Sequence, residues 1–344
     1  MHQVLYRKYR PKTFNDIIGQ ENIIKIIQNS IKTGRIGHAY IFTGPKGVGK
    51  TSLARIFSYT LNCLNSIDNV SCGTCESCKE KDHPDIIEID AASNNGVDEM
   101  RNLRNSVYLA PLIGKYKIYI IDEAHMLTTS AFNAFLKILE EPPKNVKFIL
   151  ATTELDKIID TIKSRCQIIN FNKVTQENII KNLNSIAKKE KIIISQNALE
   201  VISEISNGGI RDSISNFEKV ISYKENNIEI NDIYDVCGLL SINQKQEFIK
   251  LIEKKDISNI LKVIENWYET GKDIPIIIDD LIIYISKLIK NIYLDNETQE
   301  KDEVIILIKI LEDLDLINLK IKKSTNYRIL FQIEIIKLLS NINN

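Results

Sequence analysis

A glycine-rich segment near the N-terminus has the residue types and spacing of a loop that binds nucleotide phosphates. The stretch AYIFTGPKGVGKTSLARIF places a predicted strand before Gly44 and a helical pattern after Thr51, the context in which G-x-x-x-x-G-K-[ST] binds phosphate. We expect backbone N–H groups to surround the phosphates, Lys50 to reach the β- and γ-phosphates, and Thr51 to bind Mg²⁺. A simple glycine-rich turn is the alternative. The expected nucleotide-binding residues of the loop are Gly44, Pro45, Lys46, Gly47, Val48, Gly49, Lys50, Thr51 and Ser52.

Two carboxylates follow a second apolar run, KIYII, further along the chain. Asp122 and Glu123 come at its end, and ligands of open α/β sheets bind at the carboxyl ends of strands. We expect Asp122 to hold Mg²⁺, directly or through water, and Glu123 to polarise the attacking water as a general base. Two solvated carboxylates in a loop are the alternative.

Three further polar residues are candidates for the same site. Thr153 ends the run VKFILATT, where a hydroxyl could hydrogen-bond the water or the γ-phosphate. Arg165 precedes the next predicted strand, and Arg211 follows the pair Gly208–Gly209 at an expected helix start. From the residues alone, threonine ends many strands, and both arginines are better explained as surface charges.

Four of the six cysteines form a cluster with the spacing C-x₈-C-x₂-C-x₂-C. Two C-x₂-C steps let tight turns direct thiolates at one centre, and four thiolates suit tetrahedral Zn²⁺ without an open position for catalysis. An iron–sulfur cluster and a redox pair are the alternatives, and His83 is a substitute ligand or an ordinary loop residue. Cys166 and Cys237 are distant in sequence and are expected to be buried thiols. The expected zinc ligands are Cys63, Cys72, Cys75 and Cys78.

Short apolar runs alternate with helical patterns in the first half of the chain, which predicts an α/β layered domain that ends near Phe171. Runs of consecutive apolar residues are typical of strands covered on both faces in a parallel sheet. The expected strands are residues 39–44, 85–91, 117–124, 146–153 and 167–171.

The remainder of the chain has helical periodicity. Thr175 is a candidate N-cap with Asn178 at the third helical position, and Gly208 and Gly209 indicate a break between helices. Two apolar faces are expected to form a domain core rather than a partner surface. Their residues are Ile260, Ile264 and Trp267, and Leu281, Ile285, Leu288 and Ile292.

Length and charge limit the function classes. The 344 residues suggest two or three domains, and the net charge of zero argues against coating nucleic acid by bulk electrostatics. The N-terminus has no apolar core of a signal peptide, and no stretch has about 18 uninterrupted apolar residues. We therefore expect a cytosolic protein that does not span a membrane.

The motifs together carry a family resemblance. The series TGPKGVGKTS, IIDEAHML, LATTE, KSRC and GGIRDS resembles the clamp-loader branch of the AAA+ ATPases. With the opening LYRKYRPKTFNDIIGQ and the cysteine insert, the chain is similar to the gamma/tau subunit family of bacterial DNA polymerase III. The likeness is specific from Tyr6 to about residue 225 and weaker towards the end.

The resemblance implies roles that the residues alone leave open. Thr153 matches sensor 1, Arg165 matches an arginine finger that acts on a neighbouring subunit's ATP, and Arg211 matches sensor 2. The N-terminal segment, which is rich in basic and aromatic residues, matches the family segment that packs near the adenine. Without the resemblance, it could also be interpreted as a nucleic-acid-binding tail. Its residues are Tyr6, Arg7, Arg10 and Pro11.

The resemblance also implies the domain organisation. Residues 1–171 would form the AAA+ domain with a zinc module at 63–84, residues 172–236 a helical lid, and residues 237–344 a helical collar for oligomerisation. Longer family members continue into a segment that binds the polymerase and helicase. The chain therefore resembles a short, gamma-like form or a truncation, with only indirect contact to the polymerase core.

The function implied is an ATPase motor subunit that uses ATP, Mg²⁺ and Zn²⁺ to load the sliding clamp onto primer–template DNA. Its implied partners are delta- and delta-prime-type subunits, further gamma copies, the clamp and DNA. Another AAA+ machine, such as a helicase loader or branch-migration motor, is one alternative. A non-catalytic scaffold subunit is a second, although the intact phosphate loop argues against it. A zinc-ribbon DNA-binding module is a third and leaves that loop unexplained.

Overall fold

The computed structural model describes residues 3–66, 70–79, 83–294 and 301–341, which fall into two compact units. Unit 1 is Met1–Lys191 with Ser206–Glu218, and unit 2 is Ile192–Ile205 with Lys219–Asn344. The boundary falls within the expected lid segment 172–236, and the division into ATPase domain, lid and collar stays a prediction. Residues 67–69 and 80–82 of the expected zinc module lie outside the described residues.

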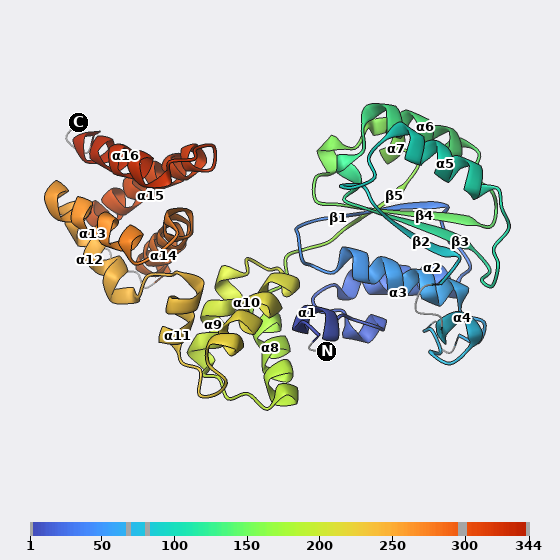
Figure 1. Cartoon of the computed structure of the whole chain (residues 1–344), viewed down its shortest axis with the longest axis horizontal. Coiled ribbons are helices and arrows are strands. Elements are labelled where there is room, and N and C mark those ends of the chain that lie inside the picture. The colour runs from blue at the N-terminus through green and yellow to red at the C-terminus, as the bar shows by residue number, and fades with distance from the viewer. Residues whose placement is uncertain (1–2, 67–69, 80–82, 295–300, 342–344) are drawn as a thin grey trace. The chain divides into compact units, whose positions relative to one another are not determined.

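Unit 1 contains a five-stranded parallel sheet with the order β2-β3-β4-β1-β5 (Figure 1). All five predicted strands are confirmed. The central strands β1, β3 and β4 are buried along nearly their whole length, whereas the edge strands β2 and β5 are partly exposed. Continuous apolar runs thus mark the strands that are covered on both faces. The strands are β1 (Ala39–Thr43), β2 (Ile86–Asp90), β3 (Lys117–Asp122), β4 (Val146–Thr152) and β5 (Gln167–Asn170).

Helices cover both faces of this sheet (Figure 1). Along β3, Ile118 and Ile120 pack on the side of α2 and α3, while Tyr119 and Ile121 pack on the side of α5, α6 and α7. The sheet therefore separates two apolar cores within unit 1. The helices are α2 (Glu21–Lys32), α3 (Lys50–Asn62), α5 (Val97–Val107), α6 (Thr129–Glu140) and α7 (Asp160–Lys163).

The remaining elements of unit 1 lie around the carboxyl edge of the sheet and in the long connections. The predicted N-cap is confirmed, because Thr175 Oγ1 accepts a 3.4 Å hydrogen bond from the Asn178 N–H at the start of α8. The predicted break is also confirmed, because Gly208 and Gly209 separate two helices. These elements are α1 (Leu5–Lys8), α4 (Glu76–Lys79), α8 (Gln176–Glu190), the first part of α10 (Ile210–Tyr223), and the 3-10 helices η1 (Phe14–Asp16), η2 (Ala124–Met126) and η3 (Leu155–Lys157).

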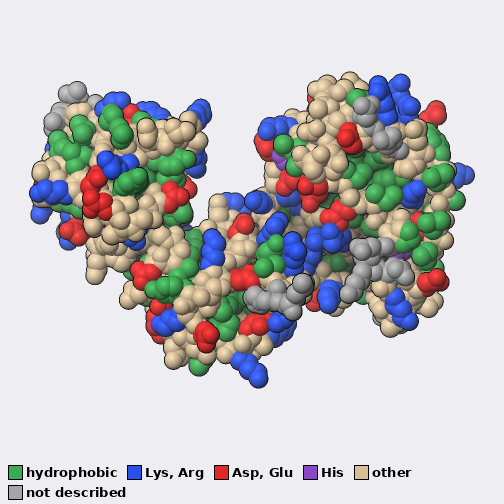
Figure 2. Space-filling view, viewed as in Figure 1, with side chains coloured by type: hydrophobic (Ala, Val, Ile, Leu, Met, Phe, Trp, Pro, Cys, Tyr) green, Lys and Arg blue, Asp and Glu red, His purple; other side chains and the backbone are tan. Residues whose placement is uncertain are grey.

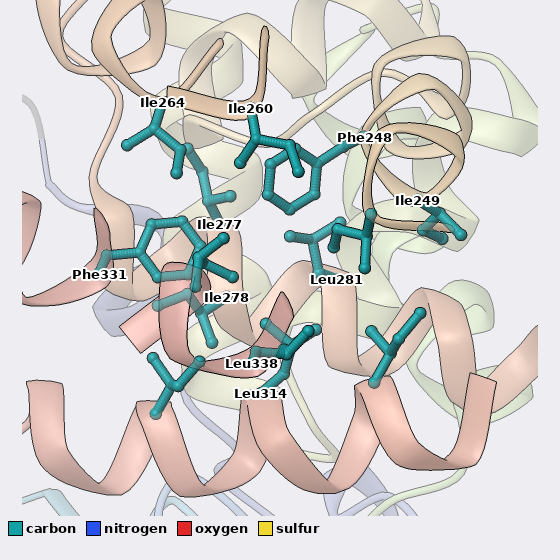
Figure 3. Close-up of a cluster of buried hydrophobic side chains, with 14 of the residues drawn as sticks. Phe248, Ile249, Ile260, Ile264, Ile277, Ile278, Leu281, Leu314, Phe331 and Leu338 are labelled. Carbon is teal, nitrogen blue, oxygen red and sulfur yellow. The ribbon is translucent and has the colours of Figure 1, made fainter. Parts of the chain in front are cut away.

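Unit 2 is helical, with an apolar core that both predicted faces enter (Figure 3). Trp267 packs against Phe248 with ring centroids 4.7 Å apart, and Leu288 and Ile292 lie partly buried at the edge of the core. The expectation that these faces form a core is confirmed. The helices are α9 (Gln196–Ile205), the end of α10, α11 (Ile230–Cys237), α12 (Ile242–Glu253), α13 (Ile257–Glu269), α14 (Ile274–Leu294), α15 (Lys301–Ile321) and α16 (Tyr327–Asn341).

One buried ion pair interrupts the apolar sequence of α14. Lys245 Nζ lies 2.6 Å from Asp280 Oδ1, and the Leu240 N–H donates to Asp280 Oδ2 at 3.1 Å. Burial raises the pKa of the Asp280 carboxyl, and Lys245 opposes this shift. Among the described residues, no helix has the length and apolar character needed to cross a membrane.

Cys166 and Cys237, which were expected to be buried thiols, are partly exposed as whole residues. Cys166 directly precedes the edge strand β5, and Cys237 is the last residue of α11, so neither is covered on all sides. Burial of the thiol nevertheless raises the pKa of Cys166 to about 12.

Candidate nucleotide site and cysteine centre

The phosphate loop connects the end of β1 to the first residue of α3, Lys50. Gly49 precedes the helix with a φ of 102°, a left-handed conformation that residues with a Cβ rarely adopt. The glycine lets the loop turn directly into α3, so that the unpaired N–H groups of the first helical turn face the loop. Such a helix start attracts phosphate.

The ammonium group of Lys50 lies against this loop. Its Nζ donates 2.7 Å hydrogen bonds to the carbonyl oxygens of Gly44 and Pro45. Burial lowers the pKa of Lys50, whereas the nearby carboxylates of Glu123 and Asp122 oppose the shift. Lys50 is therefore a buried cation at the point where the loop would receive negative charge.

A hydrogen bond joins the loop to the carboxyl end of β3. Thr51 Oγ1 donates to Asp122 Oδ2 at 2.8 Å. Two neighbouring ligands of octahedral Mg²⁺ with bonds of about 2.05 Å lie about 2.9 Å apart. The two oxygen atoms therefore have the spacing of adjacent Mg²⁺ ligands, and a hydroxyl and a carboxylate are donors that Mg²⁺ accepts.

Glu123 follows β3 with a left-handed φ of 47°, and its N–H donates to Asp122 Oδ1 at 3.0 Å. Its Oε2 atom is buried and makes no hydrogen bond within the described residues, although His125 Nδ1 lies 3.6 Å away. The left-handed backbone and the buried oxygen without a hydrogen bond mark Glu123 as a candidate general base.

His125 connects this carboxylate to the end of β4. Its Nδ1 lies 3.2 Å from Thr152 Oγ1, and its Nε2 lies 3.3 Å from Glu154 Oε1. Thr153, the residue with the expected sensor role, follows β4 and is half-buried. Thr153 does not line the cavity described below.

A cavity of about 660 Å³ brings most of the expected nucleotide-binding residues together. This volume is within the range of small-molecule sites, about 300–1,000 Å³. Figure 2 shows both basic and acidic side chains on this side of unit 1, around the start of α3. The expected residues that line the cavity are Tyr6, Arg7, Arg10, Pro11, Lys46, Gly47, Val48, Gly49, Lys50, Thr51, Ser52, Asp122, Glu123 and Arg211.

Within the N-terminal segment, Arg10 reaches the helix that follows the phosphate loop. Its Nε donates to Ser52 Oγ at 3.3 Å. Burial lowers the pKa of Arg10, and the nearby Arg55 lowers it further. Arg10 thus lies at the phosphate end of the cavity, where a guanidinium group suits an anion.

Arg165 is separated from this cavity. It precedes β5 and so lies at the amino edge of the parallel sheet, whereas the phosphate loop lies at the carboxyl edge. Its guanidinium donates to the Thr161 carbonyl at 2.9 Å and pairs with Glu140 at 3.0 Å, and it is partly exposed. Arg165 is therefore not positioned to act on the cavity of its own chain.

Several lining residues escaped the sequence prediction. Arg55 and Glu88 form a 2.5 Å ion pair at one side of the cavity. Arg55 is four residues after Thr51 and so shares its face of α3, a helical signal that could have identified it. Tyr9, Asn182 and Ile214 also line the cavity, but no local pattern distinguishes them.

The four clustered cysteines form a second candidate site. Their sulfur atoms all lie within 4.8 Å of one another, and Cys63 Sγ and Cys75 Sγ are 4.0 Å apart. Tetrahedral Zn²⁺ with bonds of about 2.3 Å places its sulfur ligands about 3.8 Å apart, so the arrangement fits one zinc ion. The Cys72 N–H points at Cys63 Sγ and the Cys75 N–H at Cys72 Sγ, at 3.2 and 3.3 Å, which favours thiolates.

His83 is not part of this cysteine centre. Its Nδ1 accepts the Asp85 N–H at 3.1 Å, which leaves Nε2–H to donate to Ser77 Oγ at 2.8 Å. Both nitrogen atoms are therefore used, and the ring packs edge-on against Tyr59. His83 connects the end of the cysteine segment to the body of unit 1.

Asp85 fixes the loop that lies beside the start of β2. Its buried carboxylate accepts hydrogen bonds of 2.7–2.8 Å from the N–H groups of Leu112, Ile113 and Gly114. Burial would raise the pKa of Asp85, but the three N–H donors outweigh it and the net shift is downwards.

Comparison with known proteins supports a family assignment. The family model described as "DNA polymerase III, delta subunit" matches residues 19–175. The tau subunit of Bacillus subtilis DNA polymerase III is 37% identical over 98% of this chain, which spans 63% of that relative. The DNA polymerase III gamma subunit of Buchnera aphidicola subsp. Baizongia pistaciae is 38% identical, and the match covers 90% of this chain and 86% of that relative.

A solved structure resembles the fold. The Thermotoga maritima RuvB Holliday junction branch migration motor superimposes with a TM-score of 0.52, covering 72% of this chain and 80% of RuvB. At 18% identity this likeness establishes the AAA+ fold and nothing about function.

Proposed function

Because this chain belongs to the gamma/tau subunit family of DNA polymerase III, we propose that it is an ATPase motor subunit of the bacterial clamp loader. In this proposal it binds and hydrolyses ATP to load the sliding clamp onto primer–template DNA in the cytosol. The chain spans 63% of its Bacillus subtilis relative and 55% of its Mycoplasma genitalium relative, so the activities of the whole relatives come to it only as proposals.

The observation that carries the proposal is the 2.8 Å hydrogen bond between Thr51 and Asp122. It brings a hydroxyl of the phosphate loop and a carboxylate of β3 to the spacing of adjacent Mg²⁺ ligands, 71 residues apart in sequence. Bound Mg²⁺ would neutralise phosphate charge. Lys50 would bind the β- and γ-phosphates, and Glu123 would take a proton from the attacking water.

Arg165 is proposed to serve the ATP of a neighbouring subunit. Its place at the amino edge of the sheet and its partial exposure favour action in trans. The pair with Glu140 is exposed enough to exchange for a phosphate at little cost. Thr153 is retained as a proposed sensor of the γ-phosphate on family resemblance alone.

The helices of unit 2 are proposed to join other loader subunits, of the delta and delta-prime types and further copies of this chain. Figure 2 shows hydrophobic side chains in several patches on their surface. Many exposed apolar residues on the same helices indicate a surface that is covered by another protein rather than one that stays in contact with water. Those on α15 and α16 include Ile305, Ile306, Ile308, Leu316, Leu319, Ile329, Ile333 and Ile336.

The cysteine centre is proposed to hold a structural Zn²⁺ ion. Four sulfur ligands leave no open coordination position, so the metal would stabilise the crossover between α3 and β2 rather than take part in hydrolysis. The nucleotide cavity contains none of the four cysteines.

The proposal is tested by measuring ATP turnover of the chain alone and reconstituted with partner subunits, sliding clamp and primed DNA. We expect slow turnover alone and strong stimulation by clamp and primed DNA together. Turnover that primed DNA and clamp do not stimulate would contradict clamp loading. ATP-dependent unwinding or translocation would instead favour the branch-migration class, and absence of ATP binding would favour a scaffold.

A further inference from the structure

The short first helix, α1, lies along α10. The Leu5 N–H at the start of α1 donates to Glu218 Oε1 at 3.0 Å, and the Leu5 side chain is buried. Glu218 and Arg211 are seven residues apart, which places them on one face of α10, two turns from each other. The residue after Leu5, Tyr6, contacts Arg211 at the start of α10.

The ring of Tyr6 packs against the guanidinium group of Arg211. Arg211 Cζ lies 4.9 Å from the ring centroid and Arg7 Cζ lies 5.8 Å from it, both within the range of a cation–π contact. The neighbouring Arg7 lowers the pKa of the Tyr6 hydroxyl, and Arg211 contributes to the same shift. Tyr6 thus interacts with two cations.

The backbone of Arg211 is attached to the phosphate loop. Its N–H donates to the Gly47 carbonyl at 3.2 Å. Gly47 has a left-handed φ of 75°, and a Cβ there would lie 3.3 Å from Asp212 Oδ2 and 3.5 Å from Arg211 Cβ. The left-handed backbone at residue 47 favours glycine, and a side chain there would be in tight contact with the start of α10.

Arg211 is otherwise exposed, and no carboxylate pairs with its guanidinium group in the described part of the chain. An arginine side chain has about 2 kcal/mol of rotamer entropy to lose when it is fixed. The backbone of Arg211 is held by Gly47, and its charged end is in contact with Tyr6.

We propose that Tyr6 is a positioning residue for Arg211, holding its guanidinium group beside the phosphate loop so that the cavity distinguishes a triphosphate from a diphosphate. This inference rests on the proposed ATP-binding function. It differs from a role for Tyr6 as a platform for the adenine, because an adenine contact would serve both nucleotides equally.

The test compares affinities for a non-hydrolysable ATP analogue and for ADP, each with Mg²⁺, in the full chain. We expect Tyr6→Leu to weaken binding of the analogue about five-fold, as loss of a cation–π contact of about 1 kcal/mol predicts, with ADP affinity within about two-fold. Tyr6→Phe retains the ring and should recover most of the discrimination. In an Arg211→Ala background, Tyr6→Leu should have no further effect on the analogue.

Lys8→Ala is the matched control on the same helix. Lys8 pairs with Glu190 at 2.6 Å and does not line the cavity, so its loss should leave the ratio of the two affinities unchanged. Thermal unfolding of each variant checks that the fold is intact.

If Tyr6→Leu weakens the binding of both nucleotides equally, or still weakens analogue binding in the Arg211→Ala background, the inference is overturned. Tyr6 would then contact the nucleoside instead. An unchanged ratio in Tyr6→Leu would overturn it as well. A wild-type chain that binds neither nucleotide would overturn the proposed function and, with it, this inference. If the wild-type chain binds both nucleotides and the Lys50→Ala chain binds neither, the proposed function is supported, and the result for Tyr6→Leu then tests this inference alone.

Discussion

The nucleotide pocket and the cysteine centre lie in the same compact unit but are assembled in opposite ways. The pocket combines the N-terminal segment, the phosphate loop, the end of β3, the middle of α8 and the start of α10. The cysteine centre comes from one segment, Cys63 to Cys78. A site made from one segment depends on local turns, whereas a site made from many depends on the whole packing of the unit.

The two sites also differ in how strongly their residues should affect stability. Substitution of a pocket residue should remove a function but lower the stability of the unit little, because the sheet beneath is covered by its own apolar cores. The described part of the cysteine segment has few buried apolar residues, so we propose that its shape depends on a bound metal and on polar anchors such as His83 and Asp85. The predictions below test this separation.

The largest effect is expected in the pocket. Glu123→Gln keeps the shape of the side chain but removes the proposed base, and should lower ATP turnover by about 10²–10⁴-fold with ATP affinity retained. Lys50→Ala is the comparison that should lose affinity as well. Both are measured as turnover and as equilibrium binding, and a Glu123→Gln chain that hydrolyses ATP normally would remove Glu123 from the chemistry.

The next effect is expected in the cysteine centre. Cys75→Ser should release zinc and lower the free energy of unfolding of unit 1 by about 3 kcal/mol when free zinc is at about 100 times its dissociation constant. Metal content is measured by elemental analysis, with Cys166→Ser as the control that keeps its zinc. ATP affinity per folded molecule should not change; loss of ATP binding in a folded, zinc-free chain would show that the sites are coupled.

A smaller effect is expected at Asp85. Asp85→Asn weakens three hydrogen bonds to a buried charge and should cost about 2 kcal/mol of unfolding free energy at neutral pH. Because the pKa of Asp85 is lowered in the folded state, its contribution is present above the ordinary Asp pKa of about 3.9 and is lost as pH falls through the folded value. The difference between the two chains should therefore shrink on acidification.

The measurement for Asp85 is denaturation at pH 7, 4 and 3 followed by circular dichroism. The single tryptophan, Trp267, is buried in unit 2, so its fluorescence reports that unit separately and should change little. A difference between wild type and Asp85→Asn that does not vary with pH would argue against the ionised carboxylate.

The smallest effect is expected at the rim of the pocket. Arg55 and Glu88 are 42% and 32% exposed, and an ion pair this accessible contributes at most about 1 kcal/mol. Arg55→Ala should change ATP affinity by less than about three-fold, with any change reduced in high salt, as titrations at two salt concentrations would show. A loss as large as that of Lys50→Ala would make Arg55 a phosphate ligand.

Sequence reasoning predicted those parts of unit 1 whose signal is local. The five strands, the phosphate loop and the four cysteines each follow from residues close together in the chain. Asp122 was also foreseen, because the carboxyl ends of parallel strands meet at one edge. Only the structure gives the distance between the Asp122 carboxylate and the Thr51 hydroxyl.

Contacts between distant segments were not predictable. Nothing in the sequence near Tyr6 specifies Arg211 as its neighbour, and Arg10 carries no sign that it reaches Ser52. Likewise His83 precedes a proline in a loop, yet both of its nitrogen atoms are used in a buried network. These pairings depend on how whole elements pack, which periodicity does not encode.

The most direct test of the account is a mixing experiment on the proposed action of Arg165 in trans. Lys50→Ala chains have an intact Arg165 but a nucleotide pocket that does not work. Arg165→Ala chains have an intact nucleotide pocket but lack the arginine. In reconstituted loader with clamp and primed DNA, each variant alone should be about 10³–10⁵-fold slower than wild type, whereas an equal mixture should recover a substantial fraction of the turnover. A mixture no faster than the two variants alone, or an Arg165→Ala chain with full turnover, would contradict a site completed by its neighbour.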